Sequence, residues 1–194
     1  MKLILGSQSK NRKEILEKAG YVFDIVVPDV NEKAIKTPDP YQRSLILARA
    51  KAEALISKIK EPAVIIASDL IVMSDGVLYE KPETEREARE FLKKYSEGMV
   101  AEAVCAIVVV NTETHKKYEG IDKSKVSFKP FSDAVIEDFI KNGEPLTRAG
   151  AFSVTHPILK PYVNKIEGSE SCVMGLSLIL LQKLLEQVGY KKQN

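Results

Sequence analysis

The sequence predicts an α/β fold, a mixed and twisted sheet with helices on its faces. Strand-like and helix-like segments alternate in the first half of the chain, and long neighbouring strands dominate the middle. That mixture is typical of layered α/β domains. The 194 residues suit a single domain, or two tightly joined lobes without a separate linker. Because loops at strand ends often line ligand sites, we expect a central cleft between two lobes.

The first half begins with an expected strand over residues 3–6, a helix over 9–19 and a second strand over 23–27. Asp39 is a good N-cap for the next helix, since Pro40 suits the first helical position. An apolar strand over 63–67 is expected to end at Ser68 and Asp69. A hairpin should follow it around residues 74–76.

The second half is predicted to contain longer strands and three helices. Thr84 to Glu87 reads as a capping box that starts a helix. The remaining expected elements are strands over 101–110 and 118–128, a helix from Ser132, a loop over 143–161, a strand over 162–166 and a closing helix over 174–188.

The composition excludes several classes of protein. The chain has 29 basic and 27 acidic residues, so a local cluster rather than the overall field would bind an anion. An RNA-binding domain is a weak hypothesis, because the aromatic residues do not interleave with a basic stripe, and we expect no stable nucleic-acid partner. No apolar run reaches the ~18 residues of a membrane span. Cys105 and Cys172 lack paired spacing, which favours a reducing, cytoplasmic location.

The segment over residues 6–13 is a candidate anion site, because it follows a strand and opens a helix. Free N–H groups at a helix N-terminus attract anions, and the Ser7 hydroxyl and Arg12 guanidinium can add hydrogen bonds to a phosphate. The alternative is an N-cap serine followed by a solvated basic turn.

Four more charged residues are candidates, each with an ordinary alternative. Lys51 lies among apolar helix neighbours, so it either reaches solvent or meets an anion. Asp69 follows an apolar strand, where carboxylates hold metals or act as bases, but aspartate also starts turns. Glu32 and Lys81 taken alone read as surface residues. No histidine or cysteine pair has ligand spacing, so any divalent metal would be Mg²⁺ or Mn²⁺ on oxygen ligands.

Together these segments resemble the Maf family of nucleotide pyrophosphatases. Short blocks carry the resemblance, in family order and over nearly the whole chain. They are LILGSQS (3–9) with Arg12, LARAKA (47–52), ASD (67–69), DG (75–76), EKP (80–82), GEP (143–145), AGAF (149–152), IEGS (166–169) and VMGL (173–176).

The resemblance implies an ITPase-like fold, hydrolysis between the α- and β-phosphates of a nucleoside triphosphate, a divalent metal and a homodimer. It implies that Asp69 is the catalytic carboxylate and that Glu32 and Asp69 bind the metal. The residues that it implies for phosphate binding are Ser7, Arg12, Lys51 and Lys81.

The chain departs from the family pattern at positions that select the substrate. Asn11 stands where many members have arginine, and Leu70 stands where the pyrimidine-preferring branch has threonine. Thr155 aligns with a glutamine of that branch or a glutamate of the branch that acts on 7-methyl-GTP. Ala101, Cys105 and Ser177 differ as well. We therefore expect a pyrophosphatase that acts on dTTP, UTP or modified nucleotides. 7-Methyl-GTP is an alternative substrate. The alternative function is that of a nucleotide-binding regulator with weak or no catalytic activity.

Overall fold

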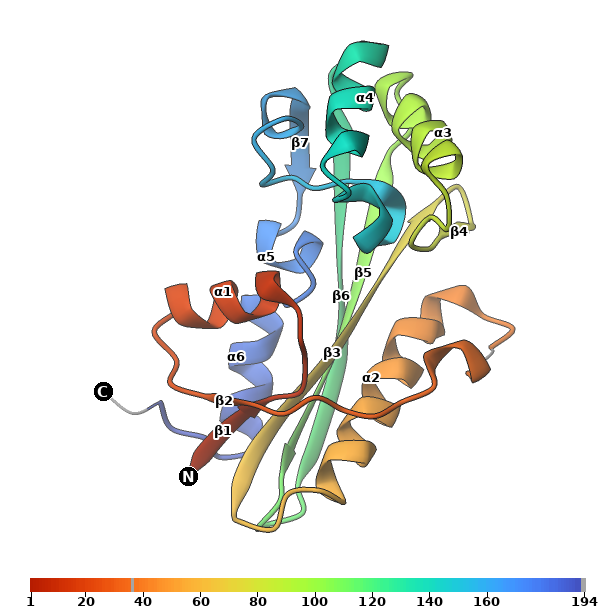
Figure 1. The fold of residues 1–194 in the computed structure, drawn as a ribbon. Helices are drawn as coiled ribbons and strands as arrows, with labels where there is room; N and C mark the ends of the chain where they lie inside the picture. The colour runs from red at the N-terminus through yellow and green to blue at the C-terminus, as the bar shows by residue number, and fades with distance from the viewer. Residues whose placement is uncertain (36, 193–194) are drawn as a thin grey trace. The chain divides into compact units, whose positions relative to one another are not determined.

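The computed structural model describes residues 1–35 and 37–192, and the chain divides into two compact units. Unit 1 contains Met1–Asp69, Cys105–Asp122 and Gly175–Asn194, and unit 2 contains Leu70–Val104 and Lys123–Met174. The predicted mixed α/β class is confirmed: the described strands form a seven-stranded sheet of order β2-β1-β3-β5-β6-β7, with β4 paired to β3 (Figure 1).

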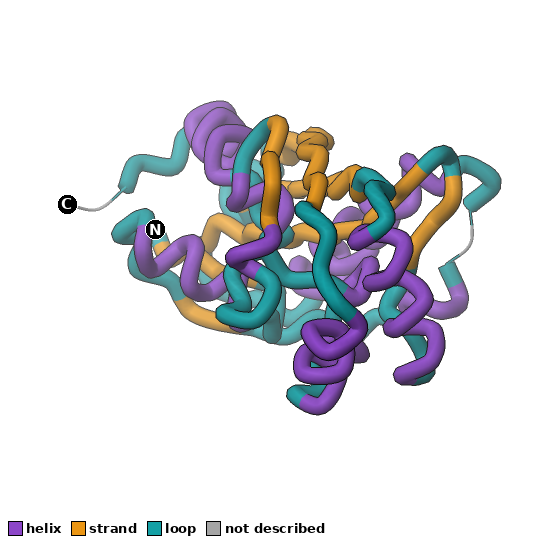
Figure 2. The backbone as a smooth tube through the Cα atoms, turned by 90° about the horizontal axis from the view of Figure 1, so that it is seen from above, coloured by secondary structure: helices purple, strands orange, loops and turns teal. Residues whose placement is uncertain are grey.

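The strands are β1 (Lys2–Leu5), β2 (Asp24–Ile25), β3 (Ala63–Ser74), β4 (Val77–Tyr79), β5 (Ala101–Asn111), β6 (Lys117–Phe128) and β7 (Val163–Glu167). The helices are α1 (Lys10–Lys18), α2 (Pro40–Ile56), α3 (Glu85–Ser96), α4 (Asp133–Lys141), α5 (Glu170–Val173) and α6 (Leu178–Gln187). Short 3₁₀ turns lie between them, the first being η1 (Glu32–Ala34). Figure 2 traces the loops that connect these helices and strands.

Unit 1 is built on parallel strands with helices on both faces. β1 pairs in parallel with β2 and with the first part of β3. Leu55 of α2 packs with Ile65 and Ala67 of β3 in one buried cluster. In Figure 1, α2 lies on one side of these strands, and α1 and α6 lie on the other. Both faces of the strands are therefore covered, which explains why β3 is apolar along most of its length.

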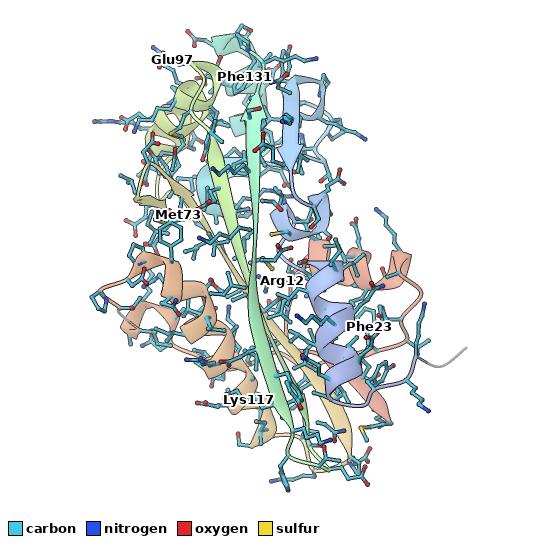
Figure 3. The ribbon with its side chains drawn as sticks, turned by 180° about the vertical axis from the view of Figure 1, so that it is seen from behind. Arg12, Phe23, Met73, Glu97, Lys117 and Phe131 are labelled. Atoms are coloured by element: carbon cyan, nitrogen blue, oxygen red, sulfur yellow. The ribbon has the colours of Figure 1, made fainter. Side chains whose placement is uncertain are left out.

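Unit 2 is built on antiparallel pairs and an aromatic core. The end of β3 pairs with β4, and the end of β6 pairs with β7. The rings of Tyr95, Phe128 and Phe152 lie 5.3 to 5.6 Å apart between centroids, a spacing typical of favourable aromatic pairs. Phe131, labelled in Figure 3, packs on Phe128 from the loop before α4.

The prediction that a strand ends at Asp69 is wrong, because β3 runs without interruption through Ser74. The Asp69 carboxylate is paired with Lys51, so the polar residue can stay buried inside the strand. The apolar residues that follow continue the strand by pairing with β4, with Val72 opposite Tyr79.

The single closing helix predicted over residues 174–188 is also wrong. The chain forms the short α5, leaves the helical conformation at Gly175, whose φ is 99°, and starts α6 at Leu178. The Ser177 hydroxyl caps α6 by accepting a hydrogen bond from the Leu180 amide at 3.3 Å. By contrast, the helix starts predicted at Asp39 and Thr84 are confirmed, since both side chains accept hydrogen bonds from backbone amides of the first turn.

Within residues 1–35 and 37–192, every helix falls short of the length and apolar character that a membrane crossing requires.

A tight turn at Gly150 supports the core of unit 2. Gly150 has a φ of 69°, and a Cβ at this position would lie 2.9 Å from Val72 Cγ1 and 3.0 Å from Tyr95 Oη. The next residue, Ala151, is buried with a φ of 62°. Positive φ at a residue with a Cβ is costly, so this turn stores strain that the surrounding packing maintains.

Gly150→Ala is expected to destabilise the protein more than Gly143→Ala. Gly143 has the same φ of 69°, but nothing lies within 4 Å of a Cβ added there. The Gly143 variant should therefore lose only the ~1–2 kcal/mol of a left-handed alanine. The Gly150 variant should lose about 1–3 kcal/mol more through overpacking. Urea unfolding of both variants measures the difference, and equal losses would contradict the packing argument.

Candidate functional site

The loop after β1 is held close to the body of unit 1. The Gly6 amide donates to the Ile66 carbonyl at 2.8 Å, and the Ser9 amide donates to Ser7 Oγ at 3.1 Å. A Cβ on Gly6 would lie 2.3 Å from Leu55 Cδ1, so only glycine permits this approach to α2. Ser9 then caps α1. The loop thus holds Ser7 and the first turn of α1 in a fixed position, and its binding of an anion stays a prediction.

Arg12, in the first turn of α1, is oriented by two hydrogen bonds. Its Nε donates to the Gly175 carbonyl at 2.9 Å, and its Nη1 donates to Ser7 Oγ at 3.2 Å. Figure 3 shows Arg12 beside the start of α6, consistent with the contact to Gly175. The guanidinium is therefore held in one orientation next to the Ser7 hydroxyl. The structure brings together the two residues that sequence analysis assigned to this loop.

The ammonium group of Lys51 contacts two carboxylates, those of Asp69 and Glu32. Lys51 Nζ lies 2.5 Å from Asp69 Oδ1 and 3.0 Å from Glu32 Oε1. The side chains of Lys51 and Asp69 are each only 9% exposed, whereas that of Glu32 is 51% exposed. Lys51 therefore does not reach solvent from a buried flank, which was the ordinary alternative for this residue. It bridges a buried carboxylate and a partly exposed one.

The position of Lys51 on α2 creates this contact. α2 packs against β3 through Ala48, Ala52 and Leu55, which share the buried cluster with Ile65 and Ala67. Lys51 is buried among these residues on α2, and Asp69 lies two residues beyond Ala67 on the same face of β3. The burial of α2 on the strand thus places the ammonium directly over the carboxylate.

Burial raises the pKa of the Asp69 carboxyl above its ordinary value. The positive charges of Lys51 and Arg12 act in the opposite direction, and the negative charge of Glu32 adds to the increase. Burial is the largest of these effects, so Asp69 is a more basic carboxylate than an exposed aspartate. Such a group is suited to accept a proton from water.

The carboxylates of Glu32 and Asp69 fit a divalent metal ion. Their oxygens approach one cation, which shows that both can face a single positive centre. Among residues 1–35 and 37–192, no group of three or more histidine, cysteine or acidic side chains could hold a metal. Mg²⁺ is often bound by one or two carboxylates together with substrate phosphates, so two carboxylates suffice.

Lys81 lies in unit 2 and is exposed. The segment that carries it is fixed, because the neighbouring Glu80 carbonyl accepts a hydrogen bond from the Gly150 amide at 3.1 Å. Its contact with phosphate stays a prediction, as does the ligand cleft.

Gly175 is a residue of the site that sequence analysis did not single out. Its carbonyl orients Arg12 from a position 163 residues away in the chain. The only sequence signal was its place in the block VMGL, which gave no indication of a contact with the first loop.

Comparison with known proteins identifies the family of the chain. The family model described as Maf-like protein matches residues 2–188. The chain belongs to the Maf-like protein family. A 7-methyl-GTP pyrophosphatase of Dictyostelium discoideum is 42% identical over 194 residues, covering 96% of this chain and 97% of that protein. A dTTP/UTP pyrophosphatase of Vibrio vulnificus (strain YJ016) is 33% identical, covering 96% of this chain and 98% of that protein.

Among solved structures, a nucleoside-triphosphatase (dITP/XTP pyrophosphatase) from Mycobacterium abscessus is 20% identical and covers 66% of this chain and 74% of its own. The TM-score of this match is 0.40.

Asp69→Asn is expected to leave the protein at least as stable as the wild type at neutral pH. The raised pKa of Asp69 means that folding disfavours its ionised form, so stability from this group is greatest at low pH and falls as pH rises through the folded pKa. A neutral amide removes that cost, and Lys51 retains Glu32 as a partner. Thermal unfolding at pH 7 tests this.

Lys51→Met is expected to have the opposite effect. It leaves the buried Asp69 carboxylate without its closest positive charge, which costs about 3–5 kcal/mol for buried pairs. Lys18→Met is a suitable control, because Lys18 and its partner Glu14 are both exposed. Chemical unfolding of the three proteins measures the losses, and a Lys51 variant as stable as the control would contradict the structural role of the pair.

Proposed function

We propose that this protein is a nucleoside triphosphate pyrophosphatase, which cleaves between the α- and β-phosphates and releases a monophosphate and pyrophosphate. One observation carries the proposal: a buried carboxylate, Asp69, is paired with Lys51 and feels the positive charge of Arg12, on the strand β3 that pairs with β1, which leads into the Ser7 loop. The names of the Dictyostelium and Vibrio relatives support it, since both are pyrophosphatases of nucleoside triphosphates.

The cations of the site bind the triphosphate. Transfer of a phosphoryl group needs positive charge to compensate the charge that develops on the phosphate oxygens. Arg12 presents its guanidinium in one orientation beside the Ser7 hydroxyl, so the pair can donate several hydrogen bonds to one phosphate. Lys51 adds a nearby positive charge, and Lys81 is the fourth proposed phosphate ligand.

Asp69 is the proposed catalytic residue. Its basic carboxylate accepts a proton from the attacking water, while Arg12 and Lys51 hold the phosphates. Glu32 and Asp69 are proposed to hold Mg²⁺ or Mn²⁺, which would supply positive charge near the phosphate oxygens and lower the pKa of bound water. Glu32 suits this role, because its partly exposed carboxylate contacts the same ammonium as the buried Asp69.

The base preference is proposed to favour 7-methyl-GTP over dTTP and UTP. The relative named for 7-methyl-GTP is 42% identical, and the relative named for dTTP/UTP is 33% identical. Leu70, Ala101 and Cys105 also differ from the residues usual in the pyrimidine-preferring branch. Ala101 and Cys105 are fully buried in β5, so neither offers a polar group to solvent.

A nucleotide-binding regulator without activity is the alternative, favoured by the changes at Asn11, Leu70 and Thr155. A homodimer and a cytoplasmic location also remain proposals, and both rest on the expectations from the sequence.

Asp69→Asn should lower the rate of pyrophosphate release by about 10²–10⁴-fold, the usual contribution of a catalytic base. The assay uses wild type and variant with Mg²⁺ or Mn²⁺. Asp138→Asn is the control, since this exposed aspartate of α4 pairs with exposed Lys141 and should keep full activity. Equal activity of wild type and the Asp69 variant would exclude the proposed role of Asp69. Binding of nucleotide by calorimetry with no hydrolysis by the wild type would favour the regulator.

A panel of triphosphates tests the base preference. Release of pyrophosphate should have the highest kcat/KM with 7-methyl-GTP, compared with GTP, dTTP and UTP. A higher value with dTTP or UTP would place the chain with the pyrimidine branch instead. If folded protein turned over none of the panel, the proposed activity itself would fail.

A further inference from the structure

One ammonium group occupies the position between the two carboxylates that would bind a metal ion. Lys51 Nζ contacts both Asp69 Oδ1 and Glu32 Oε1, at 2.5 and 3.0 Å. A divalent ion held by the same two oxygens would need the space between them that the ammonium fills. The two cations therefore cannot occupy this position together.

We propose that Lys51 is an internal competitor of the metal, which leaves Glu32 and Asp69 when a divalent ion binds and then pairs with the phosphates of the nucleotide. The proposal rests on the proposed function, and it adds that the binding of the metal ion and the binding of the triphosphate are coupled through Lys51. Metal and triphosphate would each favour the same displacement of Lys51. Each would therefore strengthen the binding of the other, because such coupling is reciprocal.

The charges of the site explain why a cation is needed between the carboxylates. Asp69 is buried, and the negative charge of Glu32 raises its pKa further, so the two carboxylates repel each other in a medium that screens poorly. Arg12 cannot take the place of Lys51, since its guanidinium is held by the Gly175 carbonyl and Ser7. Arg12 compensates part of the Asp69 charge from a distance, whereas a cation in contact with both carboxylates has to be Lys51 or a metal ion.

The surroundings allow the exchange. Glu32 lies in the short turn η1, and its side chain is half exposed, so an ion can reach the pair from solvent through this carboxylate. Lys51 has a long, flexible side chain on a rigid helix, so its ammonium can move while α2 stays packed. A triphosphate bound at the Arg12 loop would offer the displaced ammonium a new anionic partner.

The test measures binding of Mn²⁺ without nucleotide, by electron paramagnetic resonance of the free ion. Lys51→Met removes the competitor and should raise the affinity for Mn²⁺ roughly tenfold, a typical size for coupling between two ligands. Lys18→Met removes one exposed positive charge from α1 and should leave the affinity unchanged. Equal or weaker Mn²⁺ binding by the Lys51 variant would overturn the proposal.

A second variant locates the ion. Adding Glu32→Gln to Lys51→Met should abolish the gain, because one of the two metal ligands is lost. If the gain persisted, the ion would be bound elsewhere and the competition would be refuted.

A measurement on the wild type covers the case in which Lys51→Met does not fold. Side-chain ¹⁵N spectra of the lysine ammonium groups, with the Lys51 signal identified by its loss in Lys51→Arg, should show Lys51 protected from exchange by its two ion pairs. Saturation with Mg²⁺ should remove that protection, and an unchanged signal would overturn the proposal. Neither readout requires turnover, so absence of pyrophosphate release would refute the proposed function separately.

Discussion

The ion pair between Lys51 and Asp69 is the interaction on which the site depends. A carboxylate in the middle of an apolar strand is tolerated only with a partner, because an uncompensated buried charge is costly. The partner comes from α2, whose apolar residues pack on the same face of β3. The packing that stabilises unit 1 is therefore also what assembles the charged site.

Contacts of the backbone at Gly6 and Gly175 fix the positions of the other charged and polar groups of the site. Gly6 allows the first loop to approach α2 closely, and the Gly175 carbonyl orients Arg12 beside Ser7. Both depend on glycine: Gly6 leaves no room for a side chain, and Gly175 adopts a positive φ that breaks the helical course between α5 and α6. The positions of Ser7 and Arg12 thus follow from backbone geometry as much as from charge.

Local patterns predicted elements well where local physics decides them. The N-caps at Asp39 and Thr84 were predicted correctly, because a cap involves residues only two or three positions apart. The strand boundary at Asp69 was not, because the residue stays in β3 through a partner 18 positions away. The closing helix was also predicted too long, since the apolar pattern continues across the break that Gly175 makes.

The sequence by itself determined the α/β class, the family and the residue types available for the chemistry. The ordered blocks and the alternation of strands and helices were sufficient for these, because they depend on local periodicity and on residue identity. Only the tertiary structure decided that the Lys51 ammonium contacts both Asp69 and Glu32. It also decided that the Gly175 carbonyl orients Arg12. These contacts join residues far apart in the chain, so they arise only when the helices pack on the sheet.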